Sequence, residues 1–237
     1  FTAMLLDPGD EGFVAPFNHL PRILVPWTAP PSRLAGLLET ERPAGGTAIY
    51  DALFAAAPMF QRRHHTRAAL IVISDGADTA SDHTLAQARE TLRRSDAFVY
   101  AIAIDSATEQ RASTRVNPEA LREITAPSGG YTEVVRTYQE VGPATERIAQ
   151  ELNSQYTLGY AAVRPQDGTW RSIRVRVKNR AYVARSRRGY FAAPGFTRSA
   201  IDKPSHAIGR YAAVRSRTMN QVGAGIMTLA AMPPHRK

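Results

Sequence analysis

The sequence predicts an α/β protein whose sheet is doubly wound and mostly parallel, with helices on its faces. Residues 69–73 and 97–104 are continuous apolar runs, and such runs are typical of strands that are buried on both faces. Helical patterns with apolar residues three or four apart occupy 48–62, 80–95 and 138–154. Strands that alternate with helices of this length favour a parallel sheet between two helical layers.

The N-terminal region is predicted to supply an antiparallel hairpin at one edge of this sheet. Its two strands are expected at 11–17 and 22–27. Pro26 favours an edge position for the second strand, because proline cannot donate a hydrogen bond to a neighbouring strand. Residues 1–6 have the pattern of a helix end, and 33–39 the pattern of a short helix.

Residues that can cap helices mark where the next elements begin. Thr47 is predicted to cap the helix at 48–62, and Asp78 or Thr79 to cap the helix at 80–95. Proline suits the first turn of a helix, and glycine pairs mark turns. The remaining elements of this region are a helix from Pro118 to Ala126 and a strand at 131–135.

After residue 154 the pattern changes from long helices to short strands. Strands are expected at 155–161, 170–178 and 181–187, and the second alternates apolar with basic side chains, as a half-buried strand does. Within the last segment, 223–232 is expected to form one or two helical turns. The sequence therefore predicts an α/β domain at 1–154, a small antiparallel β unit at 155–192 and a basic, poorly ordered tail at 193–237.

Charge is distributed unevenly along the chain. Residues 1–160 carry 14 Arg or Lys and 19 Asp or Glu, whereas residues 161–237 carry 16 and 2. Any attraction to a polyanion therefore concerns the last third of the chain. The absence of cysteine excludes disulfides and thiolate chemistry, and no apolar run reaches the roughly 20 residues of a membrane span.

Two short segments at predicted loop edges carry oxygen ligands. Gly45-Gly46-Thr47 precedes a helix, and Ser74-Asp75-Gly76 follows a buried strand. In open α/β sheets, ligands bind outside the carboxyl ends of the strands. A threonine hydroxyl and an aspartate carboxylate suit a hard cation such as Mg²⁺, which also keeps several waters.

The order and spacing of these segments resemble the von Willebrand factor type A (VWA) domain. The resemblance rests on Gly45-Gly-Thr-Ala-Ile-Tyr-Asp-Ala-Leu53 and on Ala69-Leu-Ile-Val-Ile-Ser-Asp-Gly-Ala-Asp-Thr79. Further motifs are similar to the bacterial subgroup described as VWFA-related Acidobacterial proteins, so that the resemblance covers about residues 1–191. These motifs are Glu151-Leu-Asn-Ser-Gln-Tyr-Thr-Leu-Gly-Tyr160, Gly168-Thr-Trp-Arg-Ser-Ile-Arg-Val-Arg-Val177 and Arg188-Gly-Tyr190.

The resemblance implies a metal-ion-dependent adhesion site made by three loops. Thr47 would supply the ligand of the second loop and Asp75 that of the third. The Asp-x-Ser-x-Ser motif of the first loop does not occur before Asp7, so we expect an N-terminally truncated chain that lacks the first, central strand. Because that loop holds most of the protein ligands, Mg²⁺ or another divalent cation is expected to bind weakly or not at all.

The resemblance also implies a function and a location. The function would be that of a non-enzymatic protein-binding or adhesion-type module, in which a carboxylate of a partner protein completes the metal coordination. Members of the family are commonly exported, so a periplasmic or extracellular location is expected.

A second hypothesis assigns the basic β unit and tail to binding of nucleic acid or another polyanion. Basic and aromatic side chains on one face of a sheet can contact phosphates and stack on bases. The simpler interpretation is a solvated sheet face whose charges protect its edges, and it makes nucleic acid an unlikely partner. The residues concerned are Arg171, Arg174, Arg176, Arg180, Arg185, Arg187 and Arg188, with Trp170, Tyr182 and Tyr190.

No catalytic residue is predicted. Ser74 and Asp75 lack the Gly-x-Ser-x-Gly turn of a hydrolase nucleophile, and the Gly45-Gly46 loop lacks a phosphate-binding lysine. A hydrolase with a metal-activated water would need a general base that the sequence does not offer convincingly. Asp51 lies one turn into its helix, and two roles stay open for it. Its carboxylate can orient the metal loop through hydrogen bonds, or it can be an exposed or capping carboxylate.

Overall fold

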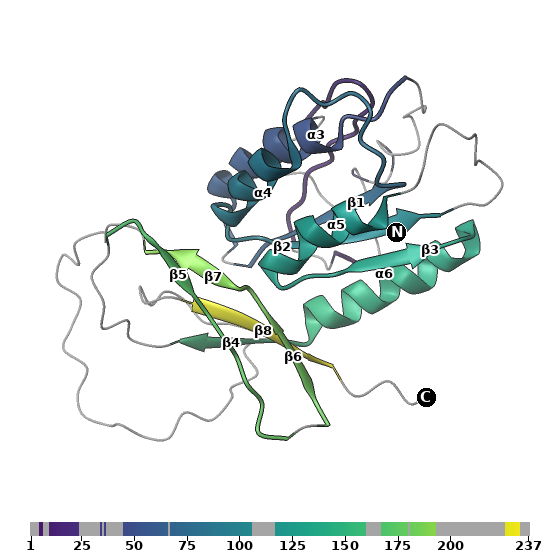
Figure 1. Cartoon of the computed structure of the whole chain (residues 1–237). Coiled ribbons are helices and arrows are strands. Elements are labelled where there is room, and N and C mark those ends of the chain that lie inside the picture. Colours follow the sequence, from purple (N-terminus) through teal and green to yellow (C-terminus); the bar gives the residue numbers. More distant parts are fainter. Residues whose placement is uncertain are drawn as a thin grey trace. The chain divides into compact units, whose positions relative to one another are not determined.

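The computed structural model describes most of the chain in two compact units, Phe1–Asn153 and Ser154–Lys237 (Figure 1). We refer to them as unit 1 and unit 2. The described residues are 5–6, 10–23, 34, 36, 45–65, 67–105, 117–159, 167–179, 181–192 and 226–232.

Unit 1 is built on a parallel sheet of three strands in the order β1-β2-β3. The strands are β1 (Ala69–Ser74), β2 (Phe98–Ile104) and β3 (Thr132–Val135). The apolar runs of the sequence therefore form parallel neighbours, with Val72 opposite Ala101. This sheet confirms the predicted α/β class.

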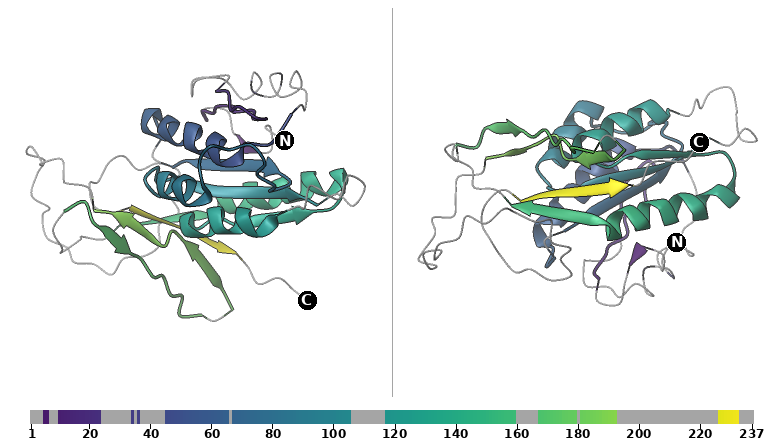
Figure 2. Two further views of the ribbon diagram at one scale, coloured as in Figure 1. Left: turned by 45° about the horizontal axis from the view of Figure 1, so that its top comes forward. Right: turned by 90° about the horizontal axis from the view of Figure 1, so that it is seen from below.

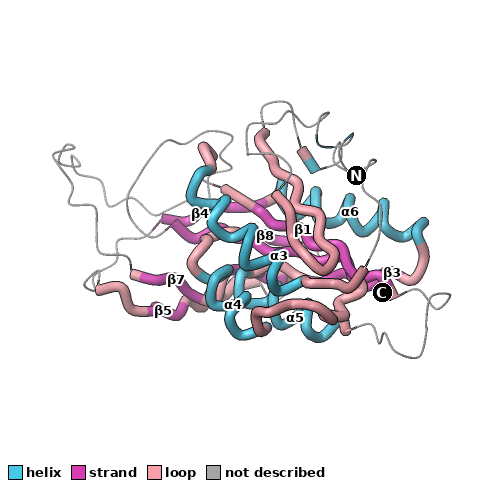
Figure 3. The backbone as a smooth tube through the Cα atoms, turned by 90° about the horizontal axis from the view of Figure 1, so that it is seen from above, coloured by secondary structure: helices cyan, strands magenta, loops and turns pink. Residues whose placement is uncertain are grey.

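Helices cover both faces of this sheet, as Figures 2 and 3 show. Alternate residues of β2 face opposite ways: Val99 packs in the cluster that contains residues of α3, α4 and α5, whereas Tyr100 packs with Ile148 of α6. Doubly wound packing explains why the strand is apolar without alternation. The helices are α3 (Ile49–Ala56), α4 (Leu85–Arg93), α5 (Pro118–Thr125) and α6 (Tyr138–Asn153), with 3₁₀ turns at Ala57–Arg62 and Ala126–Ser128.

The two neighbouring strands β1 and β2 differ in burial. Six of the seven residues of β2 are buried, whereas Val72 is the one buried residue of β1 and Ile73 is 37% exposed. Within the described residues, β2 pairs with one edge of β1, and no strand pairs with the other edge of β1. That edge of β1 is where the resemblance places the first strand of the VWA sheet.

The N-terminal hairpin is not formed as predicted. Within residues 10–23 the structure has isolated bridge residues in place of a strand at 11–17, and Phe17 and Pro21 form an antiparallel bridge. The segment contains Pro16, which cannot donate to a neighbouring strand, and the carbonyl of Pro16 instead accepts from the Arg22 amide. Most of the elements predicted at 1–6, 22–27 and 33–39 lie outside the described residues.

Both predicted helix caps next to the candidate site are wrong. Helix α3 has Ala48 at its N-cap and no capping side chain, so Thr47 is not the cap. Helix α4 begins after Thr84, whose hydroxyl accepts from the Gln87 amide, rather than after Asp78 or Thr79. Residues 77–83 therefore form an irregular loop instead of the first turn of a helix.

Unit 2 is an antiparallel β unit, as predicted, with two small sheets. The first has the strand order β4-β8-β6, and the second pairs β5 with β7. The strands are β4 (Gln155–Gly159), β5 (Trp170–Ser172), β6 (Val183–Ser186), β7 (Gly189–Phe191) and β8 (Ile226–Met232).

Strand β8 corrects the prediction for the end of the chain, where helical turns were expected at 223–232. Residues 226–232 lie between β4 and β6 and pair with both. These two pairings satisfy the backbone groups of a short apolar segment, and neither partner is adjacent in the sequence. The domain limits at 154 and 192 stay predictions.

Candidate metal site at the carboxyl edge of the sheet

Asp75 directly follows β1 and is half-buried at the carboxyl edge of the sheet. Its Oδ1 atom accepts from the Ala77 amide at 3.0 Å and from the Ser74 hydroxyl at 3.4 Å. The structure shows no hydrogen bond to its Oδ2 atom from any residue that it describes. One carboxylate oxygen therefore fixes the turn, and the second remains available to a cation.

Gly76 is required by the path of the chain beside Asp75. Its φ is +79°, and a Cβ atom there would lie 2.5 Å from the carbonyl oxygen of Asn117. The amide of Asn117 in turn donates to the Asp75 carbonyl at 3.1 Å. The start of α5 therefore packs directly against the Asp75 turn, which leaves no space for a side chain at 76.

Thr47 lies on a second loop, which is bonded to the loop that follows Asp75. The Thr47 amide donates to the Thr79 hydroxyl at 2.9 Å, and the Thr47 carbonyl accepts from the amides of Thr79 and Ala80 at 2.8 and 3.2 Å. Gly46 permits this approach, because a Cβ atom there would lie 3.0 Å from that of Ala80. The structure thus bonds the Thr47 loop to residues 79 and 80, a few positions after Asp75.

Asp78 connects the same loop to the first turn of α3. Its carboxylate accepts from the Tyr50 amide at 3.1 Å, from the Ser81 hydroxyl at 2.6 Å and from the Ser81 amide at 3.2 Å. These bonds satisfy an amide at the start of α3 that has no partner within the helix. Asp78 therefore caps α3 from a distance, although the sequence suggested that it caps α4.

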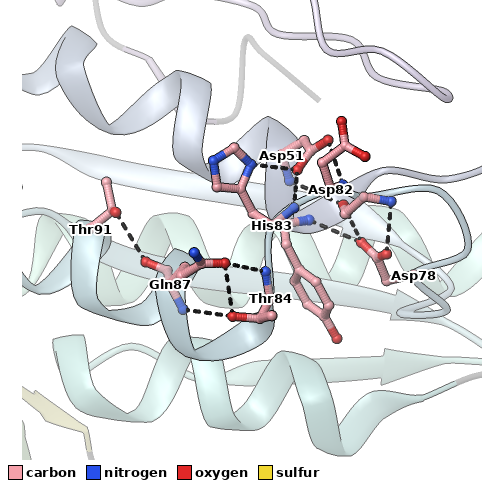
Figure 4. Close-up of polar contacts among 9 residues, drawn as sticks. Asp51, Asp78, Asp82, His83, Thr84, Gln87 and Thr91 are labelled. Carbon is pink, nitrogen blue, oxygen red and sulfur yellow. Dashed lines mark hydrogen bonds and ion pairs between the residues drawn. The ribbon is translucent and has the colours of Figure 1, made fainter.

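Asp51 makes the second connection between α3 and this loop (Figure 4). Its carboxylate accepts from the amides of Asp82 and His83 at 3.0 and 2.9 Å, and its Oδ1 atom lies 2.7 Å from Nδ1 of His83. The His83 ring stacks on Phe54, with centroids 3.9 Å apart. Asp51 is therefore not an exposed carboxylate but holds the segment at Asp82 and His83, and a role in orienting the metal loop stays a prediction.

These contacts also set the acidity of Asp51. Burial alone would raise the pKa of this carboxyl, but the amides of His83 and Asp82 and the imidazole of His83 bind its charged form. The net result is a pKa below the ordinary value for aspartate. Asp51 is therefore a charged clamp at neutral pH.

The start of α4 completes the rigid frame of the loop. The Thr84 hydroxyl accepts from the Gln87 amide, and the Gln87 side chain accepts from the Thr84 amide at 2.8 Å, which makes a capping box. The Thr-x-x-Gln pattern was visible in the sequence. It was missed because Asp78 and Thr79 stand closer to the strand and are good capping residues as well.

The donor set fits a metal site with few protein ligands. Thr47 and Asp75 offer one hydroxyl and one carboxylate, whereas Asp51 and Asp78 already accept from amides. Within the described residues no three His, Cys, Asp or Glu side chains are grouped to hold a metal ion. Mg²⁺ can be held by one or two carboxylates if water fills its other positions, so these residues fit weak binding.

The adjacent residues His64 and His65 both contact the side chain of Glu11. Glu11 accepts from the amides of His64 and His65 at 2.6 and 3.1 Å, and its Oε2 atom lies 2.8 Å from Nδ1 of His64. Burial would raise the pKa of Glu11, but these contacts with His64 and His65 lower it overall. The histidine pair therefore anchors the N-terminal segment.

Solved structures of other proteins share this fold. A von Willebrand factor type A protein from Catenulispora acidiphila matches with a TM-score of 0.53 and 17% identity, over 72% of this chain and 40% of that one. An aerotolerance-related membrane protein from Bacteroides fragilis matches with a TM-score of 0.53 and 21% identity, over 64% and 83%. Proximal thread matrix protein 1 from the mussel byssus, with a zinc-occupied metal-ion-dependent adhesion motif, matches with a TM-score of 0.51 and 14% identity, over 62% and 37%.

Unit 1 therefore has the von Willebrand factor type A fold. This conclusion agrees with the motif order of the sequence and with the helices on both faces of the sheet. No protein-family model matches the chain, and no curated protein does. Among the described helices, none is long and apolar enough to span a membrane.

Proposed function

We propose that this chain is a non-enzymatic, adhesion-type binding module that recognises a carboxylate of a partner protein through a divalent cation. The observation that carries the proposal is the pair of loops joined at Thr47 and Thr79, which holds Asp75 at the carboxyl edge of a VWA sheet. The zinc-occupied adhesion motif of the mussel protein supports a cation in this fold.

In this proposal Asp75 anchors the cation and Thr47 supplies a hydroxyl, directly or through water. The metal, when bound, supplies a Lewis-acidic position that a carboxylate can occupy. The protein contributes the frame: Gly76 and Asn117 hold the Asp75 turn, and Asp51 and Asp78 hold the loop behind it. None of these carboxylates is assigned a proton-transfer role, because Asp51 and Asp78 are hydrogen-bonded to amides.

The partner and the location are part of the same proposal. A periplasmic or extracellular position suits a bacterial binding module of this fold, and a membrane protein stands among the similar structures. Magnesium is the expected cation, because both ligands are hard oxygen donors.

Isothermal titration of Mg²⁺ and Mn²⁺ into the whole chain and its variants tests the proposal. We expect weak binding to the unmodified chain and no measurable binding to Asp75→Asn. Asp82→Asn is the matched control, because this exposed aspartate on the same loop loses the same charge, and its carboxylate makes no hydrogen bond within the described region. Thr47→Val should weaken binding less than Asp75→Asn does.

The outcome that would contradict the assignment is equal affinity in the unmodified chain and Asp75→Asn. A loss of affinity in Asp82→Asn as large as that in Asp75→Asn would also contradict it, because it would indicate a diffuse charge effect. Circular dichroism and thermal unfolding of each variant separate loss of binding from loss of fold.

A further inference from the structure

The chain between β5 and β6 forms a hairpin that leads out to a turn and back (Figure 1). At its base Arg171 is paired with Tyr190, and next to this pair the Ile173 amide donates to the Arg188 carbonyl at 2.8 Å. At its end the Tyr182 amide donates to the Asn179 carbonyl at 3.2 Å. The chain therefore reverses direction between Asn179 and Tyr182, beyond the paired strands β5 and β7.

Three apolar side chains near the turn of this hairpin are exposed to solvent. Val177 is 39% exposed, Tyr182 is 46% exposed and Val183 is 67% exposed. They make up three of the eight large apolar side chains that are exposed in the described residues, and they fall within seven positions of the sequence. Exposed apolar side chains this close together in the sequence make the end of the hairpin a candidate contact surface.

Cations flank the same turn. Arg174, Arg176 and Lys178 are exposed on the outgoing arm, where they alternate with apolar residues. Lys178 directly follows Val177 in the sequence, so exposed charged and exposed apolar side chains are neighbours along this arm. The structure shows no ion pair for these three side chains with any described residue, and the one acidic side chain described in unit 2 is Asp167, which pairs with Arg171.

The aromatic side chains proposed for base stacking are largely engaged within unit 2. Trp170 packs edge-on against Phe191, with ring centroids 5.0 Å apart, and Arg187 lies 5.8 Å from the ring centroid of Tyr190. Exposed valines cannot stack on bases, and a water-soluble polyanion offers nothing apolar to cover them. The combination of exposed valines, one tyrosine and flanking cations instead suits the boundary between lipid headgroups and acyl chains.

We propose that the described residues at the end of this hairpin, 174–179 and 181–183, bind to an anionic lipid bilayer as a peripheral contact. Val177, Tyr182 and Val183 enter the headgroup boundary, and Arg174, Arg176 and Lys178 contact the lipid phosphates and carboxylates. Tyrosine suits this position because its ring is apolar and its hydroxyl stays hydrated. This inference does not depend on the metal site of unit 1.

Co-sedimentation of the whole chain with vesicles tests the inference. Vesicles of phosphatidylcholine with about 30% phosphatidylserine should retain the protein, and vesicles of pure phosphatidylcholine should retain much less. One variant neutralises the cations, Arg174→Gln with Arg176→Gln and Lys178→Gln. We expect the partition coefficient to fall by about fivefold for each neutralised cation.

A second variant, Val177→Ser with Tyr182→Ser and Val183→Ser, removes the apolar part and keeps the charge. It should also lose vesicle binding, and it should keep any weak retention on a nucleic-acid column. The matched control is Arg62→Gln with Arg67→Gln and Arg136→Gln, which removes three exposed cations of unit 1. This control should bind vesicles as the unmodified chain does, and thermal unfolding confirms that each variant is folded.

Three results would overturn the inference. If the apolar variant bound anionic vesicles as well as the unmodified chain, the surface would be a general polyanion site. If the control variant lost as much binding as the hairpin variant, net charge rather than this hairpin would account for retention. Tighter binding to a single-stranded oligonucleotide than to vesicles would favour the nucleic-acid alternative instead.

Discussion

The two units use their charged side chains differently. In unit 1, Glu11, Asp51 and Asp78 accept hydrogen bonds from backbone amides, and Glu133 binds Arg147 through both oxygens at 2.9 and 3.2 Å. In unit 2, most of the exposed charge is basic and makes no described ion pair. The carboxylates of unit 1 that accept from amides therefore stabilise its fold, whereas the exposed cations at the end of the hairpin of unit 2 make no described ion pair.

Burial follows the same division. Tyr100 and Ile102 of β2 are fully buried between two helical layers. In the described part of unit 2, Gly189 and Ala192 are the buried residues, and Ile173 and Val175 are half-buried. Unit 1 therefore carries most of the apolar packing that the structure describes, and substitutions there should cost more stability.

The largest expected effect is on the core of unit 1. Ile102→Ala should lower the free energy of unfolding by about 3 to 4 kcal/mol, because it leaves a cavity between β2 and α6. Ile173→Ala, at a half-buried position of unit 2, should cost about 1 kcal/mol. Urea unfolding of both variants measures the difference, and equal losses would show that the two units are packed alike.

The next effect concerns the Asp51 clamp. Asp51→Asn should lower the free energy of unfolding at neutral pH by about 1 to 3 kcal/mol, because an amide cannot accept from both backbone donors and the His83 ring equally well. The exposed Asp82→Asn should change it by less than about 0.5 kcal/mol. Chemical unfolding of the two variants provides the measurement.

The pH dependence of the same clamp has a defined sign. The pKa of Asp51 is lower in the folded chain than in the unfolded chain, so its contribution is present above about pH 4 and is lost as pH falls through the folded pKa. Unfolding curves from neutral to acidic pH should therefore converge for the unmodified chain and Asp51→Asn. If the difference in free energy of unfolding between the unmodified chain and Asp51→Asn stayed constant at acidic pH, the role assigned to Asp51 would be contradicted.

The smallest expected effect concerns the hairpin cations. Neutralising Arg174, Arg176 and Lys178 together should change the free energy of unfolding by less than about 0.5 kcal/mol, because exposed charges without partners contribute little. Thermal unfolding at low and high salt measures this. A loss above about 1 kcal/mol would show that these cations hold unit 2 together, and the contrast between the units would fail.

The sequence predicted those elements of unit 1 that a continuous apolar run or a helical periodicity marks along the chain. The apolar runs that became β1 and β2, and the helix that begins at Pro118, are confirmed because local periodicity and a proline start determine them. Strand β8 was mistaken for helical turns because its two pairing partners are distant in sequence. Non-local pairing leaves no local signal.

For the candidate site, the sequence identified the loops but not the contacts between them. The Asp75 turn and the Thr47 loop were predicted from residue type and resemblance, and the structure bonds Thr47 to Thr79, four residues after Asp75. Asp78 and Asp51 satisfy amides about 30 positions away in the sequence, so their roles could not be predicted from local capping patterns. The central prediction is that Thr47 and Asp75 bind a divalent cation.

Paramagnetic broadening by Mn²⁺ tests that prediction most directly. In a ¹⁵N–¹H correlation spectrum of the whole chain, substoichiometric Mn²⁺ should first broaden the amides of 46–48 and 75–77, and Asp75→Asn should abolish this selectivity. Broadening that begins instead at other exposed acidic residues, or that is unchanged in Asp75→Asn, would contradict a metal site at the carboxyl edge of this sheet.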